Sequence, residues 1–184
     1  MKRMNPISPQ HGVGLLEVLI ALLVLAVGVL GFAGLQMTAL SQSDDANHRV
    51  AAVLIAQDAI ERLELNPMGR GMPENPLDSW ATNHYQAGNW AAGEQGEEPD
   101  SSCIGKDADC DPEELADWDI AQLTWLAANQ LPGGRILVDE CTFTTDLTCV
   151  IVSWGDQDDP ASCMAAAGIN VDKDSNCLVL EVAR

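Results

Sequence analysis

The first third of the chain contains a long apolar run. Residues 13–35 are apolar apart from Glu17, and residues 18–43 contain no Asp, Glu, Lys or Arg. As a helix, this run would span about 34 Å at a rise of ~1.5 Å per residue, which matches a hydrocarbon core of roughly 30 Å. The pattern therefore predicts a transmembrane helix at residues 13–35, in contact with membrane lipid. Lys2 and Arg3 on its short side predict a cytoplasmic amino terminus.

A helical pattern continues beyond the apolar run. No proline occurs between Leu35 and Leu65, and several apolar residues recur near one face of a helix: Val50, Val53, Leu54, Ile60 and Leu63. Asn66-Pro67 ends the pattern, because a residue that precedes proline avoids the helical region. We expect one helix of about 50 residues, with residues 36–66 as its amphipathic half, packed against a head.

The remainder, residues 67–184, predicts an α+β head that begins with a loop. A second helix starts at Asp111, with Pro112 in its first turn and Glu114 completing a capping-box pattern. It ends at residues 131–134, and its mostly apolar side carries Leu115, Trp118, Gln122, Trp125, Leu126 and Asn129. Three segments rich in Val, Ile and Leu predict strands: Arg135–Cys141, Cys149–Trp154 and Cys177–Val182.

Two groups of residues each have two open interpretations. The first group is three glycines spaced three residues apart in the apolar run: Gly28, Gly31 and Gly34. These glycines either allow the helix to bend or to approach another helix closely, or they only reflect the high frequency of glycine in membrane helices. Three aromatic residues in the 67–110 loop anchor that loop to the head or face a partner: Trp80, Tyr85 and Trp90.

The charge and the cysteines restrict the class of protein. The chain has 9 Lys and Arg against 28 Asp and Glu, a net charge of -19, which disfavours nucleic acid as a partner. Six cysteines lie in the C-terminal half without a C-x-x-C pair, which indicates disulfides in an oxidising compartment such as the bacterial periplasm. Many pairings are possible, and we expect the sequential one: Cys103 with Cys110, Cys141 with Cys149, and Cys163 with Cys177.

Catalytic and metal-binding patterns are weak. The histidines, His11, His48 and His84, form no credible catalytic constellation, and there is no glycine-rich phosphate loop. Residues 172–176 resemble the start of a calcium loop, but Cys177 replaces its glycine and Ala183 its final Glu. We expect no catalytic residue, no metal and no cofactor.

Glu17 is the most informative residue of the apolar run. A carboxylate within an apolar span costs about 2.5–3.5 kcal/mol on insertion scales, so it normally has a partner or a function. The alternative is that Glu17 lies close enough to the membrane edge to stay hydrated. Gly12-Val13-Gly14-Leu15-Leu16-Glu17 resembles the class III signal of type IV prepilins.

That resemblance implies a set of processing steps. Prepilin peptidase would cut between Gly12 and Val13 and remove the leader, residues 1–12, and Val13 would then be N-methylated. Glu17 would become the fifth residue of the mature chain, where the pilin family uses a Glu to meet the amine of a neighbouring subunit during assembly. The family usually has Phe or Met after the cut, whereas this chain has Val13.

Further segments are similar to the PilV group of minor pilins. GLLEVLIALLVLAVGVLGFAGLQMTAL is followed by AQDAIERLELNPMG, in which Asp58, Arg62, Asn66 and Pro67 carry the resemblance, and residues 110–138 resemble the group more weakly. The resemblance implies a long protruding N-terminal helix packed on a small antiparallel β-sheet head with disulfides.

The function implied is structural: a minor pilin that helps to initiate or modify type IV pilus assembly. Its implied partners are prepilin peptidase, the major pilin, other minor pilins and the inner-membrane assembly platform. The implied location is the inner membrane, with the C-terminal head in the periplasm, and then the fibre, including its tip. The alternatives are a minor pseudopilin of type II secretion and a membrane-anchored periplasmic enzyme or binding protein. A role in DNA uptake would need a basic patch, for which few cations are present.

Overall fold

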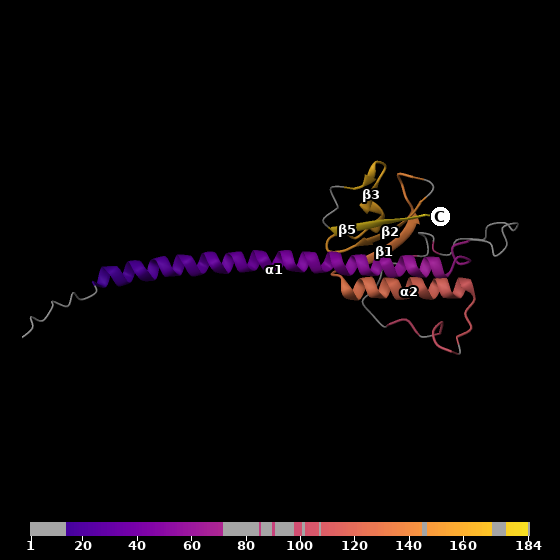
Figure 1. Ribbon diagram of the computed structural model, residues 1–184, viewed down its shortest axis with the longest axis horizontal. Helices are drawn as coiled ribbons and strands as arrows, with labels where there is room; N and C mark the ends of the chain where they lie inside the picture. The colour runs from indigo at the N-terminus through magenta and orange to yellow at the C-terminus, as the bar shows by residue number, and fades with distance from the viewer. Residues whose placement is uncertain are drawn as a thin grey trace, which may run out of the picture. The chain divides into compact units, whose positions relative to one another are not determined.

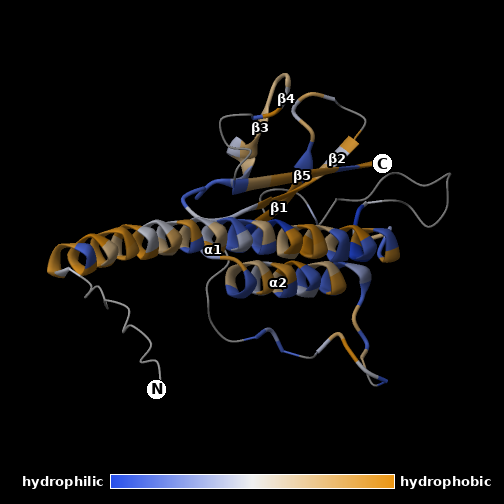
Figure 2. Ribbon diagram, turned by 60° about the vertical axis from the view of Figure 1, so that its left-hand side comes forward, coloured by the Kyte–Doolittle hydropathy of each residue, from blue (hydrophilic) through white to orange (hydrophobic). Residues whose placement is uncertain are grey.

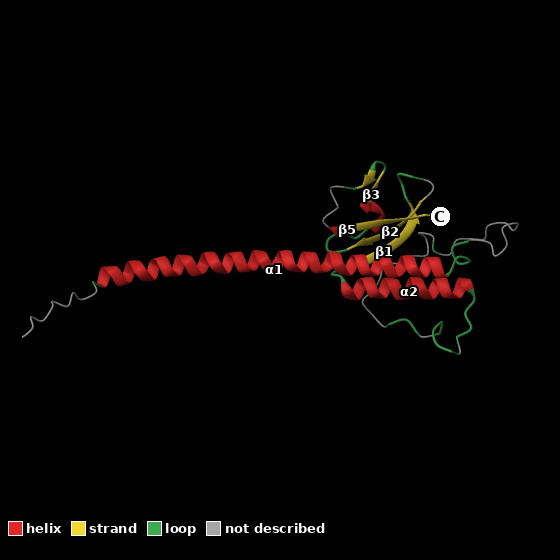
Figure 3. Ribbon diagram, viewed as in Figure 1, coloured by secondary structure: helices red, strands yellow, loops and turns green. Residues whose placement is uncertain are grey.

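The computed structural model describes residues 14–71, 85, 90, 98–100, 102–106, 108–144, 147–170 and 176–183. Within these residues, two α-helices, α1 (Leu15–Leu65) and α2 (Pro112–Gln130), precede the strands (Figure 3). A three-stranded sheet contains β1 (Arg135–Glu140), β2 (Leu147–Ser153) and β5 (Cys177–Ala183), and a two-stranded one contains β3 (Met164–Ala165) and β4 (Gly168–Ile169). The chain divides into two units, residues 1–45 and 46–184.

The long helix is as the sequence predicts. α1 is 51 residues long and ends at Leu65, immediately before Asn66-Pro67. The Asn66 side chain then organises the turn that follows, because its Oδ1 accepts a hydrogen bond of 3.0 Å from the Gly69 N–H. A Cβ atom added to Gly69 would lie 2.4 Å from Asn66 Nδ2, so this turn requires a glycine there. Asn66 therefore both ends α1 and fixes the direction of the chain beyond it.

The larger sheet is antiparallel, with strand order β1-β2-β5. β2 pairs with both neighbours, so that Val150 lies opposite Val138 on β1 and Leu180 on β5. Successive residues of a strand point to opposite faces, and here both faces are covered. β2 is accordingly buried from Thr148 to Ser153. This two-sided burial explains why its sequence is a continuous apolar run rather than an alternating one.

One face of the sheet shares a hydrophobic core with α2 and with the part of α1 that belongs to the second unit. These two helical segments lie side by side (Figure 1). The α1 residues in this core form a helical stripe that is mostly small: Ala52, Ile55, Ala56, Ala59 and Leu63. The sequence prediction for this face was wrong in part, since Val50 and Leu54 are 60% and 59% exposed. The reason is steric, because alanine side chains let α1 approach its neighbours closely. The sequence prediction instead favoured large apolar side chains such as Val50 and Leu54.

The buried side of the second helix also differs from the predicted one. The capping box is confirmed: the Asp111 carboxylate accepts hydrogen bonds of 2.9 Å from the N–H groups of both Glu113 and Glu114. However, the buried side of α2 is not the expected one and consists of Ala116, Asp119, Ile120, Leu123, Thr124, Ala127 and Ala128. The expected side, with Leu115, Trp118 and Gln122, is half-buried or exposed. Here too the core contact uses alanines, and the larger residues flank it.

The opposite face of the sheet is covered by two of the three disulfides. Its core contains Leu137, Ile151, Val179, Met164 and the cysteines of the Cys141–Cys149 and Cys163–Cys177 bridges. A short 3-10 helix, η2 (Pro160–Cys163), leads into β3 and β4; the sequence analysis predicted none of these three elements. The strand bounds also shift: β1 ends before Cys141, β2 starts two residues before Cys149, and β5 extends past Val182.

Candidate functional site

The residues expected to direct assembly fall at the start of α1. Gly12 and Val13, the predicted cleavage and methylation positions, and the leader residues lie outside the described residues. Glu17 is in the first turn of α1 and is exposed, and its N–H donates a 3.0 Å hydrogen bond to the Gly14 carbonyl. A negative charge is favourable in the first helical turn, where the N–H groups without helical partners are concentrated. The carboxylate is therefore presented outward at the beginning of an otherwise apolar helix.

The apolar half of α1 is not buried by any other described part of the chain. Every residue from 14 to 47 is exposed, and α1 contains an 18-residue window with a mean hydropathy of 2.8 and none of its residues buried. By length and composition, α1 is the one helix in the described part of the chain that could cross a membrane. Figure 2 shows this half coloured mostly as hydrophobic. A Cβ atom added to Gly28, Gly31 or Gly34 would meet no heavy atom within 4 Å.

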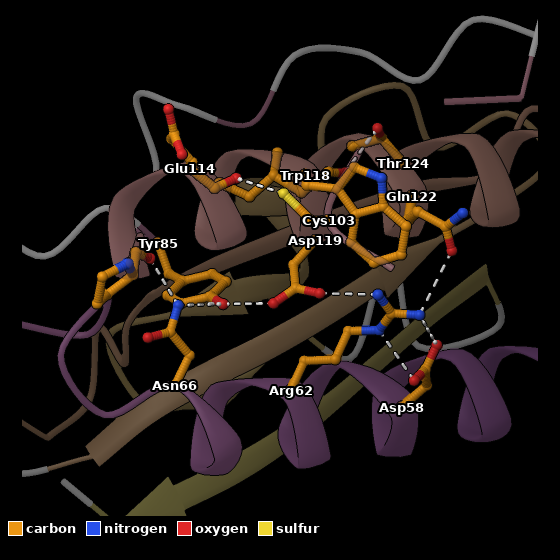
Figure 4. A network of polar contacts seen from close by, with 12 residues as sticks. Asp58, Arg62, Asn66, Tyr85, Cys103, Glu114, Trp118, Asp119, Gln122 and Thr124 are labelled. Carbon is orange, nitrogen blue, oxygen red and sulfur yellow. Dashed lines mark hydrogen bonds and ion pairs between the residues drawn. The ribbon is translucent and has the colours of Figure 1, made fainter. Parts of the chain in front are cut away.

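A second feature is a cluster of polar side chains that joins α1 to α2 (Figure 4). At its centre, the Arg62 guanidinium donates to Asp58 at 3.0 Å and to Asp119 on α2 at 2.8 Å. The Arg62 and Asp119 side chains are 19% and 6% exposed, so this ion pair is largely shielded from water. Cζ of Arg62 also lies 5.5 Å from the centre of the Trp118 ring. Arg62 thus meets α2 through both charge and a cation–π contact.

Tyr85 extends the cluster into the long loop. Its hydroxyl donates a 2.6 Å hydrogen bond to the other Asp119 oxygen and accepts one of 3.4 Å from Asn66 Nδ2. Asn66 Nδ2 also donates to the Pro112 carbonyl at 2.7 Å, and Trp90 Nε1 donates to the Tyr85 carbonyl at 3.1 Å. Tyr85 is 1% exposed. Of the two open interpretations, Tyr85 and Trp90 anchor the loop to the head, whereas Trp80 lies outside the described residues.

The cluster shifts the pKa values of two of its members. Burial opposes the charge of Arg62, but its hydrogen bonds to Asp58 and Asp119 outweigh that effect and raise its pKa. Burial, assisted by the hydrogen bond to the Asp119 carboxylate, raises the pKa of Tyr85 far above its usual value. Both groups therefore keep their protons over the whole physiological range, and the cluster acts as a permanent link rather than as an acid–base pair.

The sequence analysis identified part of this cluster. Asp58, Arg62 and Asn66 were found through the PilV resemblance, and the structure brings all three into one network. Asp119 was missed, although a signal was present: it is an acid on the same side of α2 as Ala116, Ile120 and Leu123. A carboxylate on the buried side of a helix indicates a polar partner from another element, because a buried charge is costly unless it is paired.

The three disulfides link the cysteines in the expected sequential order. Cys141 follows β1 and Cys149 lies within β2, so the middle bridge joins neighbouring strands. Cys163 ends η2 and Cys177 begins β5, so the last bridge attaches the η2–β3–β4 segment to the sheet. Among the described residues, no group of three or more His, Cys, Asp or Glu side chains could hold a metal ion. The candidate calcium-loop residues 172–175 lie outside that part of the chain.

The long N-terminal helix, the small antiparallel sheet and the three disulfides constitute a type IV pilin fold. Residues 34–121 match the Tt1218-like family, described as type IV pilin Tt1218, and residues 7–33 match the prokaryotic N-terminal methylation motif. These two adjoining matches support the assignment of the chain to the type IV pilins, which are structural subunits and not enzymes. Searches of curated proteins and of solved structures find no match.

Proposed function

We propose that this chain is a minor pilin, cut by prepilin peptidase between Gly12 and Val13 and N-methylated at Val13. The observation that carries the proposal is the match of residues 7–33 to the N-terminal methylation motif, since this segment contains Gly12, Val13 and Glu17. Type IV pilins assemble with other pilins and are processed by a prepilin peptidase. The products of the cut would be a leader of residues 1–12 and a mature chain that retains the apolar helix.

The proposed mature chain uses one helix in two environments. Residues 13–35 serve first as the membrane anchor and later as part of the fibre core, while the later part of the helix packs against the head through a core stripe that runs from Ala52 to Leu63. The exposure of the apolar half supports this, because Leu22, Leu25 and Leu30 are 59%, 64% and 73% exposed in the isolated chain. Side chains of this size need lipid or neighbouring helices to cover them. The head, residues 67–184, would lie in the periplasm, where its disulfides are stable.

Glu17 is proposed as the charge that guides a subunit into the fibre. Cleavage after Gly12 creates a new amine at Val13, and in an apolar setting an amine and a carboxylate each need an opposite charge. Glu17 is exposed and carried on a regular helix, so it is positioned to meet the amine of a neighbouring subunit. This pairing would select the correct axial position of each incoming subunit, since a misplaced one would leave both charges unpaired.

We further propose membership of the PilV group, with the major pilin, other minor pilins and the inner-membrane assembly platform as partners. Support comes from the Asp58, Arg62 and Asn66 positions, which are joined in the polar cluster that attaches the end of α1 to α2. In this role the protein would help to initiate or modify pilus assembly and would become part of the fibre. A secretion defect without a pilus defect on deletion would favour the type II pseudopilin alternative instead.

The first test is the mass of the mature protein. Purified from the membrane, the wild-type chain should begin at a methylated Val13, and Gly12→Val should accumulate as a precursor that is longer by the leader. A native chain that begins at Met1 would contradict the proposal, because the Glu17 carboxylate would then have no amine nearby to pair with.

The second test addresses Glu17 itself. Glu17→Ala should insert into the membrane normally but be found in sheared pili at a level reduced by about tenfold or more, as expected for the loss of a charge pair in an apolar setting. Glu64→Ala is the matched control, because Glu64 is an exposed carboxylate on the same helix. Equal incorporation of Glu17→Ala and wild type would exclude the charge-pairing role.

A further inference from the structure

The head has two hydrophobic cores, and they differ in their cysteine content. The first core lies between the sheet and the two helices, and none of its described buried residues is a cysteine. The second core lies on the opposite face of the sheet, and four of its eight buried residues are the cysteines of two bridges. The other four are apolar: Leu137, Ile151, Met164 and Val179. The second core therefore depends on disulfides far more than the first.

The second core holds a segment that has little structure of its own. We call residues 160–169, which contain η2, β3 and β4, the cover segment. β3 and β4 have two residues each and form a separate two-stranded sheet. A ribbon of this size is not stable by itself in water. The cover segment is buried at Cys163, which is bridged to Cys177 on β5, and at the adjacent Met164. Its place on the sheet therefore rests mainly on this small core.

The hydrogen bonds of the cover segment add little independent support. The hydroxyl of Thr142 donates a 3.0 Å bond to the Ala165 carbonyl, but this bond is exposed, and water competes for both of its groups. Thr142 also follows Cys141 directly, so the bridge of that cysteine helps to position the donor. The Asn170 N–H donates a 2.8 Å bond to the Cys163 carbonyl, which joins the two ends of the β3–β4 hairpin to each other.

The first core attaches the sheet to the helices without any cysteine among its described residues. Each of the three strands contributes a buried valine to this core, Val138 on β1, Val150 on β2 and Val182 on β5. The strand pairs β1–β2 and β2–β5 form through backbone hydrogen bonds, which are likewise independent of the bridges. We therefore expect the three-stranded sheet and the helices to pack together in the reduced chain as well.

The cysteines of the second core are closed to oxidants once that core has formed. Cys149 and Cys163 are 0% exposed, and Cys141 and Cys177 are 4% and 5% exposed. Thiol–disulfide exchange requires one sulfur atom to reach another, so an oxidant has no path to these four sulfurs in the finished head. The two bridges must therefore form while the cover segment is still away from the sheet.

We propose that the head is completed in two steps: the first core packs without oxidation, and a protein disulfide of the oxidoreductase class then closes the second core. For each bridge, a cysteine thiolate of the head attacks the disulfide of the oxidoreductase, which breaks that S–S bond and forms a mixed disulfide. The second cysteine of the pair, as a thiolate, attacks the head's sulfur in the mixed disulfide and releases the oxidoreductase as a dithiol. Two electrons and two protons pass from the head to the oxidoreductase for each bridge. Oxidation thus decides whether this face of the sheet is open or covered, while the helical face stays the same.

The test is amide hydrogen exchange of the full-length protein in detergent micelles, read by mass spectrometry. The protein is unfolded and reduced, refolded with dithiothreitol present, and compared with the oxidised protein. Peptides from the cover segment should exchange at least about tenfold faster in the reduced protein, whereas peptides from α2 should change by less than about threefold, because exchange reports the opening of each region separately. Circular dichroism should show the same helix content in both samples.

Two paired variants separate the bridges without any reductant. Cys163→Ala combined with Cys177→Ala should raise the exchange of the cover segment about tenfold and leave α2 unchanged. Cys103→Ser combined with Cys110→Ser is the matched control, because this bridge belongs to neither core, and both regions should exchange as in wild type. A reduced protein in which α2 loses its protection together with the cover segment would overturn the proposal, since the head would then be one cooperative unit. So would a cover segment that stays protected after reduction, because its bridges would then be dispensable for closing the second core.

Discussion

The two halves of α1 differ in how hydrophobicity relates to burial. The first half carries large apolar side chains, yet every residue from 14 to 47 is exposed. The second half is more polar, but its core stripe includes Ala52, Ala56 and Ala59, each 0% exposed. In the second half, the fit against α2 and the sheet decides which residue is buried. In the first half, no described part of the chain covers the side chains, so their size is not set by packing within the head.

The largest expected effect is the loss of a core side chain from the second half. Leu63 is 2% exposed and Leu65, two residues later, is 82% exposed. Leu63→Ala should lower the free energy of unfolding by about 2–5 kcal/mol, the usual result of leaving a cavity in a core. Leu65→Ala should change it by less than about 0.5 kcal/mol. Urea unfolding of the mature protein in detergent, followed by circular dichroism, measures both. Similar losses in the two variants would mean that burial does not distinguish these positions.

A somewhat smaller effect is expected from the polar cluster. Asp119→Ala removes the acceptor shared by Arg62 and Tyr85, two groups that are mostly shielded from water. The free energy of unfolding should fall by about 1–3 kcal/mol, the range for leaving buried polar groups without a partner. Asp117→Ala, at an exposed position on the same helix, is the control and should be close to wild type. If the two variants were equally stable, the cluster would not contribute to the attachment of α2.

The third prediction concerns alkaline pH. Tyr85 is the single tyrosine of the chain, so phenolate absorbance reports on it alone. Since its folded pKa is raised, its contribution to stability is complete below the unfolded value of about 10 and is lost as the pH rises through the folded pKa. The native protein should therefore titrate at higher pH than the urea-unfolded chain. Coincident titration curves would show that the phenol is not held by Asp119. Tyr85→Phe should remove the absorbance change.

The smallest effect is expected in the first half of α1. Leu30 is 73% exposed, so Leu30→Ala should change the unfolding free energy of the head by less than about 0.5 kcal/mol. The measurement is the same urea titration as for Leu63→Ala, a change of identical chemistry on the same helix. A loss comparable to that of Leu63→Ala would show that the first half stabilises the head, and the contrast between the two halves would disappear.

Much of the fold could be predicted because its signals are local. The apolar run, the Asn66-Pro67 stop and the Asp111–Glu114 capping box each depend on residues close together in the sequence, and the structure confirms α1, the α2 start and the strand regions. The elements η2, β3 and β4 were missed, since strands of two residues have no measurable periodicity. Their arrangement depends on the Cys163–Cys177 bridge, which joins residues 14 positions apart.

The sequence by itself determined the long helix, its apolar half with Glu17 in the first turn, and the restriction to a disulfide-bonded α+β head. These properties follow from composition and from interactions between near neighbours. Only the tertiary structure decided which side of each helix is buried, because that depends on how closely a second element approaches. The polar cluster of Asp119 with Arg62 and Tyr85 also depends on the tertiary structure. These three residues lie far apart in the sequence, so Asp119 can form its hydrogen bonds only after the three segments have packed together.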